Sequence, residues 1–149
     1  IHLKKNKINK GILKTKWPCR LERKKLKKIP IYLDGAHNID GATKLIDYFK
    51  SKNLKIWLII GMLNNKNLKK FLEILKPILI GTIGIKIPDE KNSFTTKEIN
   101  QVCKKLKIKN YEKKSITDAN KFLLNKINPE IILITGSLYL VGKVRKIYL

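Results

Sequence analysis

The sequence predicts an α/β fold in which a mostly parallel sheet is covered by helices on both faces. Short apolar runs bounded by turn residues alternate with amphipathic stretches, a rhythm typical of parallel strands joined by crossover helices. Most of the apolar runs are nearly continuous in Ile and Leu, as expected of strands that are buried on both sides. A length of 149 residues suits one domain with one core. We therefore expect a single Rossmann-like domain.

The expected strands and helices alternate along the chain. The strands are predicted at residues 29–33, 55–60, 78–85, 110–112 and 131–135, and only the one at 110–112 is not an Ile- and Leu-rich run. The helices are predicted at residues 39–52, 67–75, 96–106, 117–126 and 138–147. The first helix is the best defined, because its apolar residues have the three-four spacing of one buried stripe.

Two later helices carry signals at their N-termini. Thr95 and Glu98 have the spacing of a capping box ahead of the helix at 96–106. Asp118 lies in the first turn of the helix at 117–126, where a negative charge is favourable to the helix dipole.

The strong positive charge makes a nucleic acid or another polyanion a candidate partner. The formal net charge is +23, from 34 basic and 11 acidic side chains. Only Arg20, Arg23 and Arg145 are arginines, however, and arginine is the residue that reads base edges and phosphates with two hydrogen bonds. Lys, Ile and Asn share A- and T-rich codons, so a mutational bias explains the excess of lysine without a polyanion partner and is the favoured interpretation. A basic nucleic-acid-binding α/β domain remains the alternative interpretation, although the lysines form no single stripe.

The apolar runs and the cysteines indicate a cytoplasmic protein without a membrane partner. The longest runs, 56–60 and 131–134, are far shorter than the roughly 18 to 20 residues that span a bilayer. Cys19 and Cys103 are too few for a disulfide framework, and no secretory segment precedes them. We therefore expect a reducing compartment.

Polar residues follow the expected strand ends, which is where open parallel sheets bind their ligands. The loop after the strand at 29–33 reads Asp-Gly-Ala-His-Asn over residues 34–38 and opens a helix, whose first N–H groups attract anions. Asp34 and His37 are candidates to contact a ribose or a substrate. Alternatively, Asn38 only caps the helix and Asp34 only satisfies the turn. The complete five-residue string favours the functional interpretation.

Two further loops have the same placement. Ser137, after the strand at 131–135, is expected to cap the last helix and to leave neighbouring N–H groups facing an anion, although capping alone is the simpler role. The loop at 61–66 is rich enough in asparagine to approach a ligand, and it reads equally well as an ordinary turn.

The common phosphate and metal motifs are absent from the sequence. Gly136 and Gly142 precede a lysine but stand one residue too far apart for a P-loop, and no Gly-x-Gly-x-x-Gly string occurs. His2 and His37 lie far apart, and neither has a cysteine or carboxylate at ligand spacing apart from Asp34. We therefore predict no metal site in this chain and no independent site for a nucleoside triphosphate.

Four strings together resemble one family. They are WPCRLE at 17–22, LDGAHN at 33–38, GMLNNK at 61–66 and GSLYLVG at 136–142. In content and order they are similar to the C-terminal domain of the folylpolyglutamate and dihydrofolate synthases, which belong to the Mur ligase superfamily. The first two strings are the specific ones. The resemblance covers most of the chain and implies a fold of the Mur ligase C-terminal type.

The resemblance implies an ATP-dependent amide ligase. Such an enzyme activates the carboxylate of dihydropteroate or folate as an acyl phosphate, which the amine of glutamate then attacks. By analogy, Arg20 and Asp34 contact ATP, His37 lies near the phosphates and the incoming amine as a catalytic residue, and Ser137 lies near glutamate. Cys19 stands where the family usually has glycine, so a backbone with positive φ there is strained.

The same resemblance implies a domain that lies outside this chain. In the family an N-terminal ATPase domain holds the P-loop, the Mg²⁺ ligands and most of the pterin site. Because the chain begins at Ile1 rather than methionine, we expect residues 1–17 to lead in from that domain and residues 18–149 to form the ligase domain, inactive alone. The family also suggests a monomeric parent. An α/β scaffold that has lost its catalytic partner is a further alternative.

Overall fold

The structure is a computed structural model that describes residues 17–148, so the expected lead-in at 1–17 lies outside the described residues except for Trp17. Its centre is a six-stranded sheet with the order β1-β2-β6-β3-β4-β5. All neighbouring strands are parallel except β1 and β2, which form an antiparallel pair. The strands are β1 (Glu22–Leu26), β2 (Ile29–Leu33), β3 (Ile56–Ile60), β4 (Leu79–Gly84), β5 (Asn110–Glu112) and β6 (Ile132–Thr135). The predicted mostly parallel sheet is confirmed.

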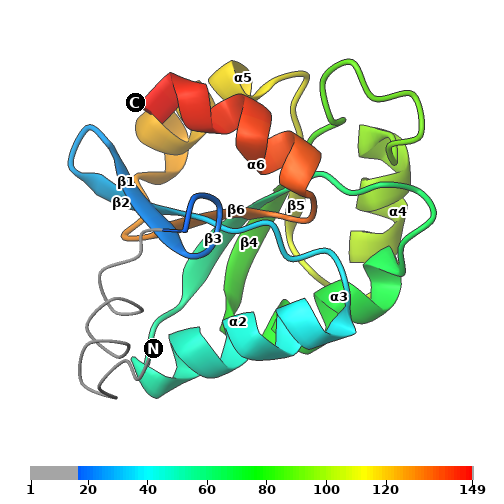
Figure 1. Cartoon of the computed structure of the whole chain (residues 1–149), viewed down its shortest axis with the longest axis horizontal. Coiled ribbons are helices and arrows are strands. Elements are labelled where there is room, and N and C mark those ends of the chain that lie inside the picture. Colours follow the sequence, from blue (N-terminus) through cyan, green and yellow to red (C-terminus); the bar gives the residue numbers. More distant parts are fainter. Residues whose placement is uncertain (1–16, 149) are drawn as a thin grey trace, which may run out of the picture.

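Helices cover both faces of this sheet, as predicted (Figure 1). One face carries α2 (Ile39–Ser51), α3 (Leu68–Leu75) and α4 (Thr96–Lys105). The other carries α5 (Ile116–Phe122) and α6 (Leu138–Arg145). Among residues 17–148, no helix has the length and the apolar character needed to cross a membrane.

The two apolar layers are separated by the alternation of side chains along the strands. In β3, Ile56, Leu58 and Ile60 pack into the layer beneath α2, α3 and α4. Trp57 and Ile59 point the opposite way and pack beneath α5 and α6. Since successive strand residues face opposite sides, a continuous apolar run is what a strand covered on both faces requires.

The predicted caps are present. Asn38 accepts a hydrogen bond from the Gly41 amide at 2.9 Å and begins α2. Thr95 and Glu98 form the complete capping box of α4. Asp118 lies in the first turn of α5, as predicted.

Strand β1 was not predicted, because its sequence lacks the apolar run that marks the other strands. Four of its five residues are charged, in the sequence ERKKL. It forms as the outer strand of a hairpin with β2, across a turn in which Lys27 has φ 54°. An edge strand has one solvated face and tolerates lysine, which also blocks pairing with other chains.

Several boundaries differ from the predicted ones for local reasons. Strand β4 begins at Leu79, after a 3₁₀ turn at Lys76–Ile78 that holds Pro77 near its start. The helix predicted at 117–126 is α5 followed by a π-helical segment, Leu123–Ile127. Helix α6 gives way to a 3₁₀ turn, Lys146–Tyr148.

Candidate functional site

The loops that follow β2, β6 and β3 meet at one edge of the sheet. The Asp34 amide donates to the Ile134 carbonyl at 3.0 Å, and the Gly136 amide donates to the Ala36 carbonyl at 3.0 Å. The Gly61 amide donates to the Thr135 carbonyl at 3.4 Å. These contacts join the loops that the sequence singled out into one backbone network.

Gly136 permits this close approach. Its φ is +109°, a conformation that side chains rarely allow, and a Cβ atom there would lie 2.6 Å from the Gly61 carbonyl oxygen. The first glycine of the string at 136–142 is therefore required by the fold at this edge.

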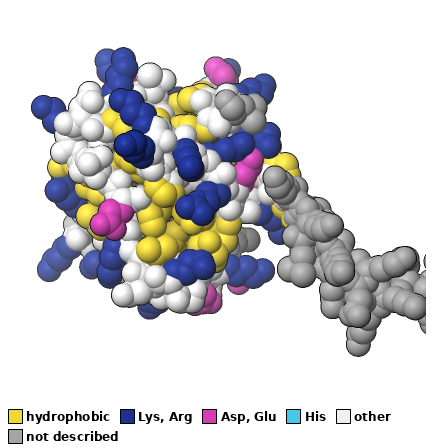
Figure 2. All heavy atoms as spheres, turned by 90° about the vertical axis from the view of Figure 1, so that its left-hand side faces the viewer, with side chains coloured by type: hydrophobic (Ala, Val, Ile, Leu, Met, Phe, Trp, Pro, Cys, Tyr) yellow, Lys and Arg dark blue, Asp and Glu magenta, His cyan; other side chains and the backbone are white. Residues whose placement is uncertain are grey.

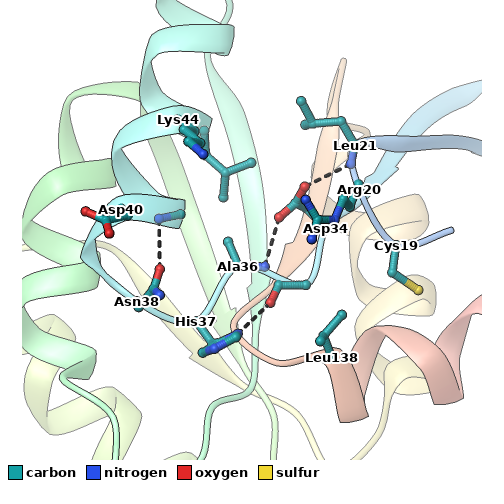
Figure 3. Close-up of a pocket in the computed structure, with 13 residues that line it drawn as sticks. Cys19, Arg20, Leu21, Asp34, Ala36, His37, Asn38, Asp40, Lys44 and Leu138 are labelled. Atoms are coloured by element: carbon teal, nitrogen blue, oxygen red, sulfur yellow. Dashed lines mark hydrogen bonds between the residues drawn. The ribbon is translucent and has the colours of Figure 1, made fainter. Parts of the chain in front are cut away.

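A pocket of about 410 Å³ opens beside this network (Figure 3). Its walls come from residues 19–21 before β1, residues 34–38 after β2, the first turns of α2, and Leu138 at the start of α6. Arg20, Asp34 and His37 all line it. The structure thus brings together three of the four side chains that were predicted as site residues.

Asp34 holds two walls of the pocket in register. One carboxylate oxygen accepts the Leu21 amide at 2.8 Å, and the other accepts the Ala36 amide at 2.8 Å. Burial raises the pKa of Asp34 above its usual value, while these two hydrogen bonds and the nearby Arg20 charge oppose that rise. The turn-satisfying role considered for Asp34 is therefore present, and it reaches across to the Arg20 segment as well.

Arg20 lies in a strained turn. Cys19 has φ 60° and Leu21 has φ 44°, so both neighbours of Arg20 are left-handed residues that carry side chains. The predicted strain at Cys19 is therefore real. The Gly35 amide donates to the Cys19 carbonyl at 2.8 Å, and the Arg20 guanidinium lies 5.9 Å from the centre of the Trp17 ring. The guanidinium itself is exposed at the rim of the pocket.

His37 is oriented by its own loop. Its Nδ1 lies 2.9 Å from the Gly35 carbonyl oxygen. A carbonyl oxygen only accepts, so Nδ1 is the donor in this contact, and in the neutral form of the ring Nε2 is the acceptor.

The pocket is lined by two cationic side chains as well as by the carboxylates of Asp34 and Asp40. Lys44, on α2, lines the pocket with Arg20. Neither cation forms an ion pair within residues 17–148. The first turn of α2 adds backbone N–H groups, so the arrangement suits an anion such as a phosphate.

Lys44 was not predicted as a site residue. It follows Gly41 by three positions and His37 by seven, so all three lie on the same side of the expected helix and its N-terminus. That spacing was the sequence signal that could have identified Lys44 as a residue of the site.

Ser137 does not line this pocket. Its hydroxyl accepts the Tyr139 amide at 3.1 Å, so the predicted helix cap is present, and the residue is only 3% exposed. Its loop is nevertheless part of the network at the sheet edge.

The loop at 61–66 lies away from the pocket as well. The Asn64 amide donates to the Asn92 carbonyl at 2.8 Å, and the Phe94 amide donates to the Met62 carbonyl at 2.9 Å. Residues 64–66 instead line a second, open cavity of about 470 Å³ with Phe94 and Val102. Within residues 17–148, no three His, Cys, Asp or Glu side chains are grouped as metal ligands.

The basic side chains are scattered over the surface. Figure 2 shows Lys and Arg spread among polar and apolar groups on the side that lies at the left of Figure 1. On this face the lysines form no continuous stripe.

Comparison with known proteins shows which family this chain resembles. Residues 19–138 match the family model described as Mur ligase, glutamate ligase domain. A dihydrofolate synthase/folylpolyglutamate synthase of Bacillus subtilis (strain 168) is 30% identical over 97% of this chain and 34% of that protein. The chain therefore spans about a third of the length of this relative.

Solved structures show the same fold. A folylpolyglutamate synthase from Thermotoga maritima is 25% identical, with a TM-score of 0.79 over 99% of this chain and 34% of the other. A Mycobacterium tuberculosis folylpolyglutamate synthase complexed with ADP and AMPPCP is 18% identical, with a TM-score of 0.82 over 98% of this chain and 35% of the other.

Proposed function

This chain belongs to the Mur ligase family as a glutamate ligase domain, and from that premise we propose that it is one part of an ATP-dependent ligase that adds L-glutamate to dihydropteroate, to folate, or to both. The observation that carries the proposal is the convergence of Arg20, Asp34 and His37 on one pocket. All three residues lie within the range 19–138 that matches the family. Arg20 and Lys44 of that pocket, which form no ion pair within residues 17–148, suit the phosphates of a nucleotide.

The proposal assigns the rest of the active site to an N-terminal ATPase domain. Residues 1–17 lead in from that domain, which supplies the P-loop, the ligands of Mg²⁺ and most of the pterin site, and residues 18–149 form the ligase domain. The Mycobacterium tuberculosis folylpolyglutamate synthase was solved in complexes with ADP and AMPPCP, and a bifunctional folylpolyglutamate synthase/dihydrofolate synthase of Yersinia pestis was solved with AMPPNP and a Mn ion. In this chain the pocket residues fit a nucleotide phosphate, whereas the described residues include no cluster of three His, Cys, Asp or Glu side chains that could hold the metal. The metal ion, when bound, partly neutralises the negative charge of the phosphate oxygens.

Arg20 and Asp34 act together on the nucleotide in this proposal. The Arg20 guanidinium neutralises charge on the phosphoryl group as it passes to the carboxylate of the acceptor. Asp34 fixes the Arg20 turn through the Leu21 amide and the His37 loop through the Ala36 amide. Closing the pocket against the ATPase domain excludes water, which otherwise hydrolyses an acyl phosphate.

His37 and Ser137 are assigned to the glutamate. The free Nε2 of His37 takes a proton from the ammonium group of glutamate, which turns it into a nucleophile. Ser137 lies outside the pocket and is nearly buried, so its assignment to glutamate comes from the family resemblance; its hydroxyl accepts the Tyr139 amide and keeps its own proton for a carboxylate.

The comparisons do not support a polyanion-binding function. The family match covers residues 19–138, which include all the residues of the pocket, and the relatives are named as synthases. The dispersed lysines add no separate binding surface on the face in view in Figure 2.

Reconstitution tests the proposal. This chain is combined with an ATPase domain of the family, and ADP release is measured with dihydropteroate or folate and glutamate. Arg20→Ala and Asp34→Ala should each lower the rate about 100-fold, the usual effect of removing a group that stabilises developing charge. Arg23→Ala is the matched control, because Arg23 is exposed on β1 and does not line the pocket. An unchanged rate for both Arg20→Ala and Asp34→Ala refutes the assignment.

A further inference from the structure

Glu22 makes more polar contacts than any role assigned above requires. Its two carboxylate oxygens accept from Nε of Arg145, at 3.0 and 2.8 Å, across 123 positions of sequence. The oxygen that is 2.8 Å from Arg145 also accepts the Cys19 amide at 3.0 Å. Lys24 adds a charge at 3.3 Å, and the Glu22 side chain is only 16% exposed.

The Cys19 contact ties Glu22 to the strained turn that presents Arg20. Left-handed residues with a Cβ atom cost about 1–2 kcal/mol each, so this turn relaxes unless its amides are held. One hydrogen bond, from the Arg20 amide to the Trp17 carbonyl at 3.3 Å, lies within the turn, and three more tie the turn to residues outside it. Gly35 bonds the Cys19 carbonyl, Asp34 bonds the Leu21 amide, and Glu22 bonds the Cys19 amide.

Arg145 in turn fixes Glu22. Arg145 is the last residue of α6, the helix whose first residue, Leu138, lines the pocket. The single Nε–H of Arg145 is shared between the two carboxylate oxygens, and this charge-assisted contact keeps the Glu22 carboxylate facing Arg145. The acceptor for the Cys19 amide is therefore held in place by a helix that also borders the site.

We propose that Glu22, held by Arg145, is a positioning residue for Arg20: it keeps the turn at 17–21 in its left-handed conformation and so directs the guanidinium to the pocket. This inference rests on the proposed function of Arg20 and extends it to two residues, Glu22 and Arg145, that do not line the pocket. A purely structural ion pair would stabilise the domain without acting through Arg20.

A double-mutant cycle separates these two roles. The KM for ATP and kcat are measured in the reconstituted ligase for wild type, Arg20→Ala, Glu22→Ala and the double variant. Arg20→Ala should raise the KM for ATP by at least about tenfold, as expected for a lost charged hydrogen bond. Glu22→Ala should raise it severalfold in the wild-type background and by less than about twofold in the Arg20→Ala background, because coupled residues are not additive.

Two variants complete the design. Glu22→Gln keeps an oxygen for the Cys19 amide and should return the KM for ATP to within about twofold of wild type, even though the ion pair is lost and the domain unfolds more easily. Glu73→Ala is the matched control, since Glu73 pairs with Lys69 and Lys70 on α3 and does not line the pocket. It should leave the KM for ATP unchanged.

The outcomes distinguish this inference from the proposed function. The positioning role is overturned if Glu22→Ala leaves the KM for ATP unchanged, or raises it equally in both backgrounds. If Arg20→Ala itself has no effect, the nucleotide role of Arg20 fails. In that case hydrogen exchange of the Cys19 amide still tests whether Glu22 stabilises the turn. If the amide exchanges no faster in Glu22→Ala than in wild type, Glu22 does not hold the turn in its left-handed conformation. If Glu22→Ala does not fold, the same cycle is run with Arg145→Lys, which keeps the charge but not the two-oxygen contact.

Discussion

The ion pair between Glu22 and Arg145 predicts that the unfolding free energy of the domain depends on pH. Hydrogen bonding to Arg145 lowers the pKa of Glu22 from its usual 4.5 to about 2. At about 1.4 kcal/mol per pH unit, the full difference corresponds to about 3 kcal/mol of folding free energy. Because the carboxylate retains some contact with water, we expect about 1–2 kcal/mol of this to be measurable.

The sign of the effect follows from the direction of the shift. Glu22 has a lower pKa in the folded state, so its contribution is fully present above pH 4.5 and is lost as the pH falls through about 2. The substitution Glu22→Gln imitates the protonated side chain. The difference in unfolding free energy between wild type and Glu22→Gln should therefore be about 1–2 kcal/mol at pH 7 and close to zero at pH 2.

Urea unfolding at a series of pH values measures this difference. Glu73→Gln is the control for a surface carboxylate, and we expect it to cost less than about 0.5 kcal/mol at pH 7. A Glu22→Gln difference that is the same at pH 7 and pH 2 would refute the reasoning, since the effect would then not come from the charge of Glu22.

Three further predictions concern the stability of local structure, each measured by urea unfolding. Cys19→Gly should be about 1 kcal/mol more stable than Cys19→Ala, the reverse of the usual order, because only glycine is relaxed at φ 60°; equal stability would contradict a left-handed residue there. Gly136→Ala should cost at least about 2 kcal/mol, because the new Cβ would lie 2.6 Å from the Gly61 carbonyl, whereas Gly142→Ala, with nothing within 4 Å, should add about 0.5–1 kcal/mol; similar effects at the two glycines would count against the close approach. Thr95→Ala should cost about 1 kcal/mol through loss of the capping box, and no loss would mean that the cap is not formed.

The parallel strands could be predicted because a strand that is buried on both faces has an apolar residue at nearly every position. The residues of β3, for example, are all apolar and all buried, so neither face allows a polar residue. The start of α2 was equally predictable, since Asn38 is a strong capping residue followed by a three-four apolar stripe.

Strand β1 and its contacts could not be predicted in this way. Its charged sequence carries no strand pattern, and its place depends on the hairpin with β2 and on Arg145 from the far end of the chain. Ion pairs between remote residues leave no local signal, so the sequence marks Glu22 only as part of the family string at 17–22. The convergence of Arg20 with Asp34 and His37 was expected from the family resemblance, and the structure explains it by the tie between Asp34 and the Leu21 amide.

The central claim is that the pocket lined by Arg20, Asp34 and His37 meets the nucleotide. Its most direct test is the change in backbone amide NMR signals when Mg²⁺ and ADP are added to this chain, isotope-labelled and assembled with an ATPase domain. The largest changes are predicted at residues 19–21 and 34–38. Changes confined to the second cavity, at residues 64–67, with no response in residues 19–21 and 34–38, would contradict the claim.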